Sequence, residues 1–373
     1  MKYSLSEVLK EFKEVNKNSL YEPVAVGKYG IRKRNEIYKK ELSDDYSKNK
    51  VIRKDNLIIG MGSNQIDVGV MVYDEIYSVS PAYHTYKINT NIVHSDYLEL
   101  LFKSNNATYF KKYSIATARQ GKKIDLKALL EEIIDIPSFE EQDNLVSKIS
   151  DIEDLIAEEE KSISLLDELT KSRFIEMFGD VESNTHNYPI KKLSEISEYW
   201  NGLTYKPTDV ADNRKGTLVL RSSNIQNGQL CFYDNVFVNC QIKERHIVKE
   251  NDILMCSRNG SSKLVGKVAL IKGLNKPTSF GAFMMIIRSK YYQYLKLFFE
   301  SVAFKHQIST GTATINQITG NMLNTIKLPV PPMIVIDEFA EFVNQIDKLK
   351  FNVQQRIEKY KELLNKKMSE YFN

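Results

Sequence analysis

The side chains best suited to chemistry in this sequence are hydrogen-bonding groups gathered in polar, turn-rich stretches between predicted strands. Arg, Lys, Asn and Gln can bind the edges of nucleic-acid bases, because their donors and acceptors match those that bases expose in a groove. Ser, Thr and Lys can bind phosphates. The alternative for each residue is a solvated loop position or a turn cap. The candidates are Arg32, Arg34, Ser63, Asn64, Gln65, Arg119, Gln120, Lys122 and Lys123 in the first half, and Arg221, Ser222, Asn224, Arg258, Asn259, Ser261, Lys263, Thr312, Thr314 and Asn316 in the second.

Four aromatic side chains lie near these stretches: Tyr83, Tyr113, Trp200 and Phe280. Aromatic rings can stack on bases of any type. Packing in a hydrophobic core is the favoured interpretation for all four.

The sequence lacks the motifs of common catalytic and nucleotide sites. It contains no N-P-P-[FY] or D-P-P-[FY] tetrapeptide and no G-x-x-x-x-G-K-[ST] loop. The histidines lack metal-ligand spacing, and Cys231, Cys240 and Cys256 form no C-x-x-C pair. Gly60 begins a G-x-G pattern, but Gln65 occupies the third glycine position, which indicates a strand-ending turn. We therefore expect a non-catalytic chain without cofactor or metal.

A long amphipathic helix is predicted after Pro137. Apolar residues recur in alternating steps of four and three, which is the heptad pattern of a coiled coil. The pattern is interrupted by Glu159, Thr170 and Arg173. No Pro or Gly occurs from Glu140 to Phe178, and Gly179 is a natural helix stop. Such a helix is about 58 Å long.

The same pattern returns 194 residues later, at the end of the chain. The lead-in I-D-I-P at 134–137 becomes L-P-V-P at 328–331. An internal repeat of this size determines the architecture. Two unrelated coiled-coil helices would have to share register, lead-in and position by coincidence.

Charge is distributed unevenly along the chain. The net charge is +4 over residues 1–139, −8 over 140–178, +8 over 179–333 and zero over 334–373. Basic globular segments suggest a polyanionic partner, although the charges could simply be solubilising. The acidic first helix would repel phosphates, so the helices are expected to serve protein contacts and spacing.

The predicted order is a mixed globular segment followed by a long helix, twice over. In the second half, strands are expected near 252–256 and 265–271, and as one run over 280–287. This order predicts an α+β fold with two pseudo-symmetric α/β domains, at 1–138 and 180–332. They would be separated by helices at 139–179 and 333–373 that pack as an antiparallel coiled coil. Two separated domains could recognise two different half-sites on a DNA duplex.

The arrangement resembles the specificity subunits of type I restriction-modification systems over essentially the whole chain. The resemblance rests on V-S-P-A-Y at 79–83, L-R-S-S-N-I at 220–225, D-I-L-M-C-S-R-N-G at 252–260, both Pro lead-ins, and S-R-F-I-E-M-F-G at 172–179. It implies two target-recognition domains for a gapped DNA site, and helices that bind two modification (methyltransferase) subunits and, through them, restriction subunits. The expected role is defence against foreign DNA together with DNA methylation. The first half departs from the pattern, with G-M-G-S-N-Q where the second has S-R-N-G.

Two alternatives remain open. The complex could methylate DNA without a restriction subunit, or the chain could be a coiled-coil scaffold whose globular domains bind protein. No apolar run of about 18 residues and no signal-peptide core occur, which favours a cytoplasmic protein without a membrane partner.

Overall fold

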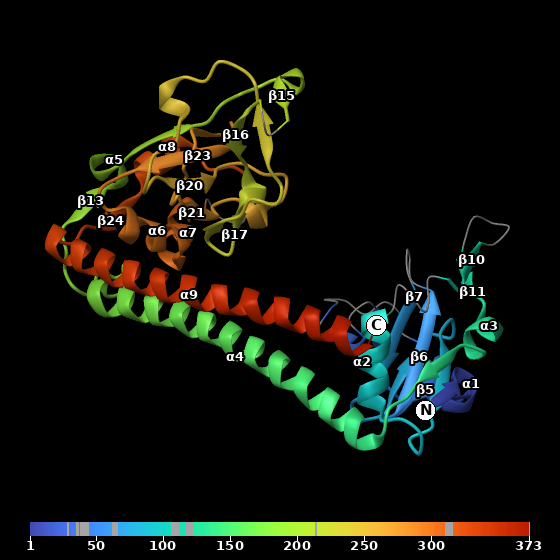
Figure 1. Cartoon of the computed structure of the whole chain (residues 1–373). Coiled ribbons are helices and arrows are strands. Elements are labelled where there is room, and N and C mark those ends of the chain that lie inside the picture. The colour runs from blue at the N-terminus through green and yellow to red at the C-terminus, as the bar shows by residue number, and fades with distance from the viewer. Residues whose placement is uncertain are drawn as a thin grey trace. The chain divides into compact units, whose positions relative to one another are not determined.

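A computed structural model describes residues 1–27, 30–34, 37, 45–61, 66–105, 112–116, 122–212, 215–309 and 316–372. The chain divides into two compact units (Figure 1). Unit 1 comprises Met1–Lys161 and Gln354–Asn373, and unit 2 comprises Ser162–Val353. No helix in these ranges is both long enough and apolar enough to cross a membrane.

Unit 1 is built on a four-stranded antiparallel sheet in the order β2-β9-β6-β7. Leu98, Leu101 and Phe102 of one helix pack with Leu57 and Tyr86 of this sheet in a single core. The sheet strands are β2 (Leu9–Glu11), β6 (Asn56–Met61), β7 (Ile66–Val70) and β9 (His84–Ile88). Two-stranded pairs are β1 (Lys2–Ser4) with β12 (Ile133–Asp135), β3 (Val24–Gly27) with β4 (Gly30–Lys33), β5 (Lys50–Ile52) with β8 (Tyr77–Val79), and β10 (Ser114–Ala116) with β11 (Lys122–Ile124). The short helices are α1 (Leu5–Val8), α2 (Ser95–Asn105) and α3 (Leu126–Leu130).

Unit 2 repeats this plan with a four-stranded antiparallel sheet in the order β14-β23-β20-β21. Its strands are β14 (Glu198–Asn201), β20 (Ile253–Cys256), β21 (Val268–Leu270) and β23 (Met284–Arg288). A second sheet, β15-β19-β16-β22, contains β15 (Val210–Ala211), β16 (Thr217–Leu220), β19 (Val236–Val238) and β22 (Thr278–Phe280). Two-stranded pairs are β13 (Ile190–Lys192) with β24 (Lys327–Pro329), and β17 (Ile225–Gln226) with β18 (Gln229–Leu230). The helices are α5 (Leu193–Ile196), α6 (Tyr292–Glu300), α7 (Val302–Ile308) and α8 (Gly320–Thr325).

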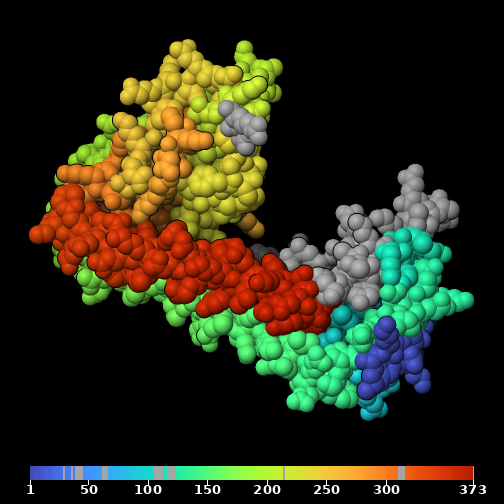
Figure 2. All heavy atoms as spheres, in the orientation of Figure 1, coloured from blue at the N-terminus to red at the C-terminus, as the bar shows by residue number. Residues whose placement is uncertain are grey.

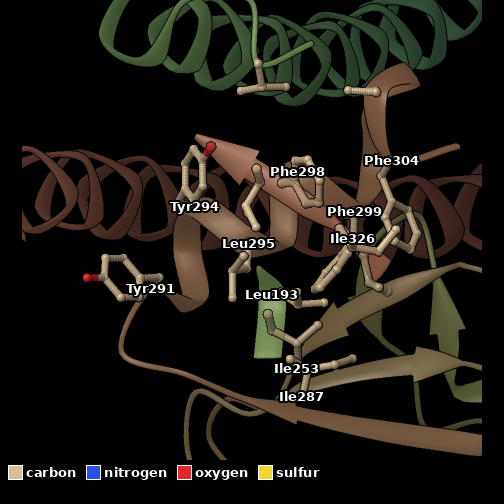
Figure 3. Packing of buried hydrophobic residues seen from close by; sticks show 14 of the residues in the cluster. Leu193, Ile253, Ile287, Tyr291, Tyr294, Leu295, Phe298, Phe299, Phe304 and Ile326 are labelled. Atoms are coloured by element: carbon tan, nitrogen blue, oxygen red, sulfur yellow. The ribbon is translucent and has the colours of Figure 1, made fainter. Parts of the chain in front are cut away.

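The core of unit 2 lies between its first sheet and helices α6 and α7. Figure 3 shows Phe298 and Phe299 of α6 beside Phe304 of α7, with Ile253 and Ile287 of the sheet close by. All five side chains are at most 1% exposed. Burial of aromatic side chains on this scale dominates core energetics. The sheet that leads into the candidate loops is therefore rigidly supported.

The predicted α+β fold and both long helices are confirmed. Helix α4 spans Phe139–Phe178 and α9 spans Met333–Phe372, so the two are offset by the predicted 194 residues. Gly179 ends α4 with a φ of +69°, a left-handed conformation that favours glycine.

The two long helices run antiparallel and in contact within each unit, and Figure 2 shows their packed side chains. In unit 1, Lys148 lies over Tyr371, while Glu159 binds Arg356 and Glu160 binds Lys361. Residues later in α4 thus contact residues earlier in α9, as antiparallel helices do. In unit 2, Arg173 lies 3.6 Å from Glu338, and Asp167 pairs with Lys350.

Each polar interruption of the first heptad pattern has a partner. Glu159 accepts a 2.8 Å hydrogen bond from Arg356 Nη2. Thr170 Oγ1 donates to the carbonyl of Leu166 one turn earlier, at 2.9 Å. Arg173 pairs with Glu338 at 3.6 Å. Each of these polar side chains thus has at least one polar partner, as buried polar groups generally do, although Nε of Arg173 makes no hydrogen bond.

One strand prediction is wrong. The run 280–287 is not continuous, because β22 ends at Phe280, Ala282 and Phe283 form a turn, and β23 begins at Met284. The Met284 amide donates to the Gly281 carbonyl at 2.8 Å and closes the turn. This turn places the side chain of Phe283, which was not among the predicted candidates, at the surface.

Candidate nucleic-acid interface

In unit 2, segments far apart in the sequence converge around Ser257, which follows β20 and is 1% exposed. The Ser257 amide and hydroxyl donate to the Phe283 carbonyl at 3.0 and 2.9 Å. The Ile318 amide donates to the Ser257 carbonyl at 2.7 Å. Arg258 forms an isolated antiparallel bridge with Gln317, the neighbour of Asn316. Backbone contacts thus fasten the loop after β20 to the turn before β23 and to the segment before α8.

The loop after β16 joins the same cluster through one side-chain contact. Asn259 Nδ2 donates to Ser222 Oγ at 3.0 Å. Asn259 Oδ1 accepts the Ser261 amide at 2.9 Å, which is an Asx turn. Five predicted candidates, namely Ser222, Arg258, Asn259, Ser261 and Lys263, are therefore carried by adjoining loops, with Asn316 beside them.

Arg258 is a cation of this cluster that is open to a ligand. Its side chain is exposed, and its guanidinium carbon lies 5.4 Å from the centroid of the Phe283 ring. No carboxylate among the described residues forms an ion pair with it. A guanidinium without an acidic partner keeps its donors available for an incoming acceptor such as guanine O6 and N7.

Arg221 is differently placed, because Asp234 already binds it. Arg221 Nη2 lies 3.1 and 3.0 Å from the two Asp234 carboxylate oxygens. Both side chains are partly exposed, so the pair remains open to exchange with another acceptor.

Asn224 does not face solvent, which contradicts its candidacy as a DNA contact. It is fully buried, its Oδ1 accepts the Arg221 amide at 2.9 Å, and its Nδ2 donates to the Cys231 carbonyl at 2.8 Å. A side chain with these bonds orders the turn after β16 and has no surface from which to reach a ligand. Asn224 is therefore not part of the candidate interface.

The remaining candidates that the structure describes lie in unit 1, away from the loop cluster of unit 2 in the sequence. Arg32 is exposed on β4, and Lys123 is exposed on β11, where it pairs with Ile115. The Arg34 guanidinium lies 5.9 Å from the Tyr46 ring centroid. Lys122 lies in β11, where only its backbone is described. Outside the described residues lie Ser63, Asn64, Gln65, Arg119, Gln120, Thr312 and Thr314.

The four aromatic candidates pack inward, as expected. Phe280 is fully buried. Trp200 donates from Nε1 to the Arg245 carbonyl at 2.8 Å. Tyr83 packs against the hydrophobic cluster under β6, and Tyr113 donates its hydroxyl to Glu132. None of the four offers a free face comparable to that of Phe283.

The thiol and imidazole near the cluster are neutral at pH 7. Burial raises the pKa of Cys256 to about 11. Burial, together with the positive charges of Arg245 and Lys243, lowers the pKa of His246. Within the described ranges no group of three His, Cys, Asp or Glu could hold a metal ion. The cluster is suited to hydrogen bonding and stacking.

Comparison with known proteins shows which proteins the sequence is similar to. Residues 1–168 match the model of the type I restriction modification DNA specificity domain. This part of the chain is therefore similar to the DNA specificity domain of type I restriction-modification systems. Over 178 residues it is 29% identical to the specificity subunit of the type I restriction enzyme EcoKI from Escherichia coli, which covers 44% of this chain and 38% of that protein. Over 263 residues it is 23% identical to the MjaVIII specificity subunit from Methanocaldococcus jannaschii, which covers 63% and 61%. The chain thus aligns with less than two thirds of either relative.

Solved structures of the specificity family share the fold. The crystal structure of a type I restriction-modification S subunit from M. genitalium aligns with a TM-score of 0.51 at 13% identity, over 99% of this chain and 95% of that one. A chain from a study of complex assembly and conformational transition in a type I R-M system aligns with a TM-score of 0.54 at 15% identity, over 100% and 97%. At these identities the likeness concerns the fold alone.

Proposed function

We propose that this chain recognises a bipartite, gapped site on duplex DNA and directs partner methyltransferase and restriction subunits to it, without catalysing a reaction itself. The observation that carries the proposal is the DNA specificity domain match over residues 1–168. The sheet order β2-β9-β6-β7 in unit 1 returns as β14-β23-β20-β21 in unit 2, which supports a second recognition domain. We expect the chain to act in the cytoplasm, with the DNA.

The long helices carry features that support protein partners. In unit 2, Leu165 and Leu169 on α4 are 54% and 48% exposed, and Phe351 on α9 is 62% exposed. Exposed apolar side chains gathered on a surface mark sites of protein contact or other apolar binding sites. The net charge of −8 over residues 140–178 would also repel phosphates. We therefore assign the helices to the methyltransferase subunits and the loop clusters to DNA.

The decisive experiment is a methylome of the host by long-read sequencing, with and without this gene. The proposal predicts that deletion removes one split, gapped methylation motif. If the motif persists unchanged while the partner subunits are expressed, the proposed role is wrong.

The alternative of a protein-binding scaffold makes a different prediction in purified material. DNA recognition predicts an affinity that falls steeply with salt, since each contacted phosphate releases counterions. A scaffold predicts no preference of the assembled complex for any duplex sequence.

Replacement of Arg258 by alanine should relax recognition in one half-site and leave the other unchanged. A bidentate arginine–guanine contact provides about 1–3 kcal/mol of discrimination, or roughly 5- to 150-fold. Competition binding by the assembled complex with duplexes varied one base pair at a time measures this effect.

The matched control is Lys263→Ala, in the same loop cluster. Because an exposed lysine is suited to contact a phosphate, we expect the Lys263 variant to weaken binding to all sequences about equally and to reduce the salt dependence. Equal weakening of every sequence by Arg258→Ala would contradict the assignment of base recognition to Arg258.

A further inference from the structure

Phe283 is a large apolar side chain held at the surface of unit 2. It is 60% exposed, whereas Phe280, three residues earlier, is fully buried. A single exposed apolar residue is common and needs no explanation by itself. Phe283 differs because of how its backbone is held and what lies beside it.

The backbone of Phe283 is fixed by contacts from distant segments. Its carbonyl accepts three hydrogen bonds, from the amides of Ser257 and Arg258 at 3.0 and 3.1 Å and from the Ser257 hydroxyl at 2.9 Å. Asn201 Nδ2 donates to the preceding carbonyl, that of Ala282, at 3.2 Å. A backbone anchored in this way presents its side chain in one place, which lowers the entropy lost when a ligand binds.

Arg258 lies against the ring. Its guanidinium carbon is 5.4 Å from the Phe283 centroid, within the range of a cation–π contact. The amide of Arg258 also donates to the Phe283 carbonyl. Backbone and side-chain contacts therefore make Arg258 and Phe283 one surface, with a hydrogen-bonding part and an apolar part side by side.

We propose that Phe283 contacts the C5-methyl group of a thymine in the same half-site that Arg258 recognises. This inference rests on the proposed function. An arginine that binds guanine O6 and N7 lies in the major groove, and the apolar group that base pairs expose there is the thymine methyl. The ring held beside the guanidinium then contacts a neighbouring base pair. Phe283 is thus a specificity-determining residue that acts through an apolar contact and not through a hydrogen bond.

The test replaces each thymine of the methylated motif in turn by uracil, which removes only the methyl group. Binding is measured by competition, using the full chain assembled with its methyltransferase subunits. For the unaltered protein, one substitution should weaken binding about four-fold, as expected for the loss of one buried methyl group. For Phe283→Ala, the thymine and uracil duplexes should bind equally at that position, while the preference for the guanine is retained.

Two further variants separate contact from folding. Phe283→Leu keeps an apolar side chain and should retain part of the uracil effect. Ile190→Ala removes a similarly exposed apolar side chain on β13 and should leave the whole effect intact, since Ile190 is 53% exposed on a strand paired with β24.

The possible results distinguish a failure of the role of Phe283 from a failure of the proposed function. Sequence-specific binding that no uracil substitution weakens overturns the role of Phe283 and leaves the proposed function standing. The same holds if Phe283→Ala retains the full uracil effect, because another residue then contacts the methyl group. Binding without any sequence preference overturns the proposed function and the inference together.

Discussion

Replacement of Phe178 by alanine should destabilise unit 2 by about 3–5 kcal/mol, the usual cost of removing a buried phenylalanine side chain. Phe178 is 1% exposed. Its ring centroid lies 4.9 Å from those of Phe174 and Tyr294 and 5.0 Å from that of Phe339. The cavity would open where α4, α6 and α9 meet. Hydrogen exchange of the full chain, with the two units followed separately, measures the loss.

The repeat supplies a counterpart to this variant. Phe372 lies 194 residues after Phe178, is 4% exposed, and packs against Tyr97 in unit 1 with ring centroids 5.5 Å apart. Phe372→Ala should therefore lower protection in unit 1, whereas Phe178→Ala lowers it in unit 2. Phe351→Ala, at an exposed position of α9, should change neither by more than about 0.5 kcal/mol. If both core variants lowered protection in the same unit, the structural equivalence of the two positions would be refuted.

Removal of the Asp252 carboxylate should lower the free energy of unfolding by a similar amount, through the loss of an ion pair and not through a cavity. Asp252 is 1% exposed and accepts hydrogen bonds of 2.7 Å from both Nε and Nη2 of Arg288, and one of 2.8 Å from the Lys249 amide. Breaking such a pair leaves the partly buried Arg288 guanidinium and the Lys249 amide without their acceptor, and the expected cost is about 3 kcal/mol, the lower end of the range for a buried pair. Denaturant unfolding of Asp252→Ala measures the change.

Asp234→Ala is the matched control. It also removes an aspartate paired with an arginine, but both side chains of that pair are partly exposed. Solvent screens exposed pairs, so the expected loss is at most about 1 kcal/mol. Equal losses in the two variants would show that burial does not govern the strength of these pairs. Asp252→Ala should also weaken DNA recognition, since Asp252 precedes the strand that leads to Arg258.

The long helices were predictable because their determinants are local and periodic. Heptad spacing, the absence of Pro and Gly up to Phe178, and a glycine after it specify α4 from sequence alone. The offset of 194 residues then specifies α9. The polar interruptions at Glu159 and Arg173 could not be interpreted in this way, because their partners lie on the other helix.

The candidate interface was only partly predictable, since polar loop residues do not reveal which way they point. Ser222, Arg258 and Asn259 were identified by residue type, and the structure brings their loops together. Asn224 has the same chemistry, but its hydrogen bonds turn it inward. Phe283 was missed because an apolar run over 280–287 has the pattern of one strand. The turn that interrupts it depends on contacts with Ser257 and Asn201, which are distant in sequence.

The composition of unit 1 has a consequence for biosynthesis. Its core takes Phe372 from the far end of α9, so the chain must leave the ribosome at least as far as residue 372 before that core is complete. The segment Ser162–Val353 is contiguous and can fold earlier, whereas residues 1–161 complete their core only after α9 has been translated. Contacts between such remote segments are slow to form. A premature stop within α9 would thus damage the unit that contains residues 1–161.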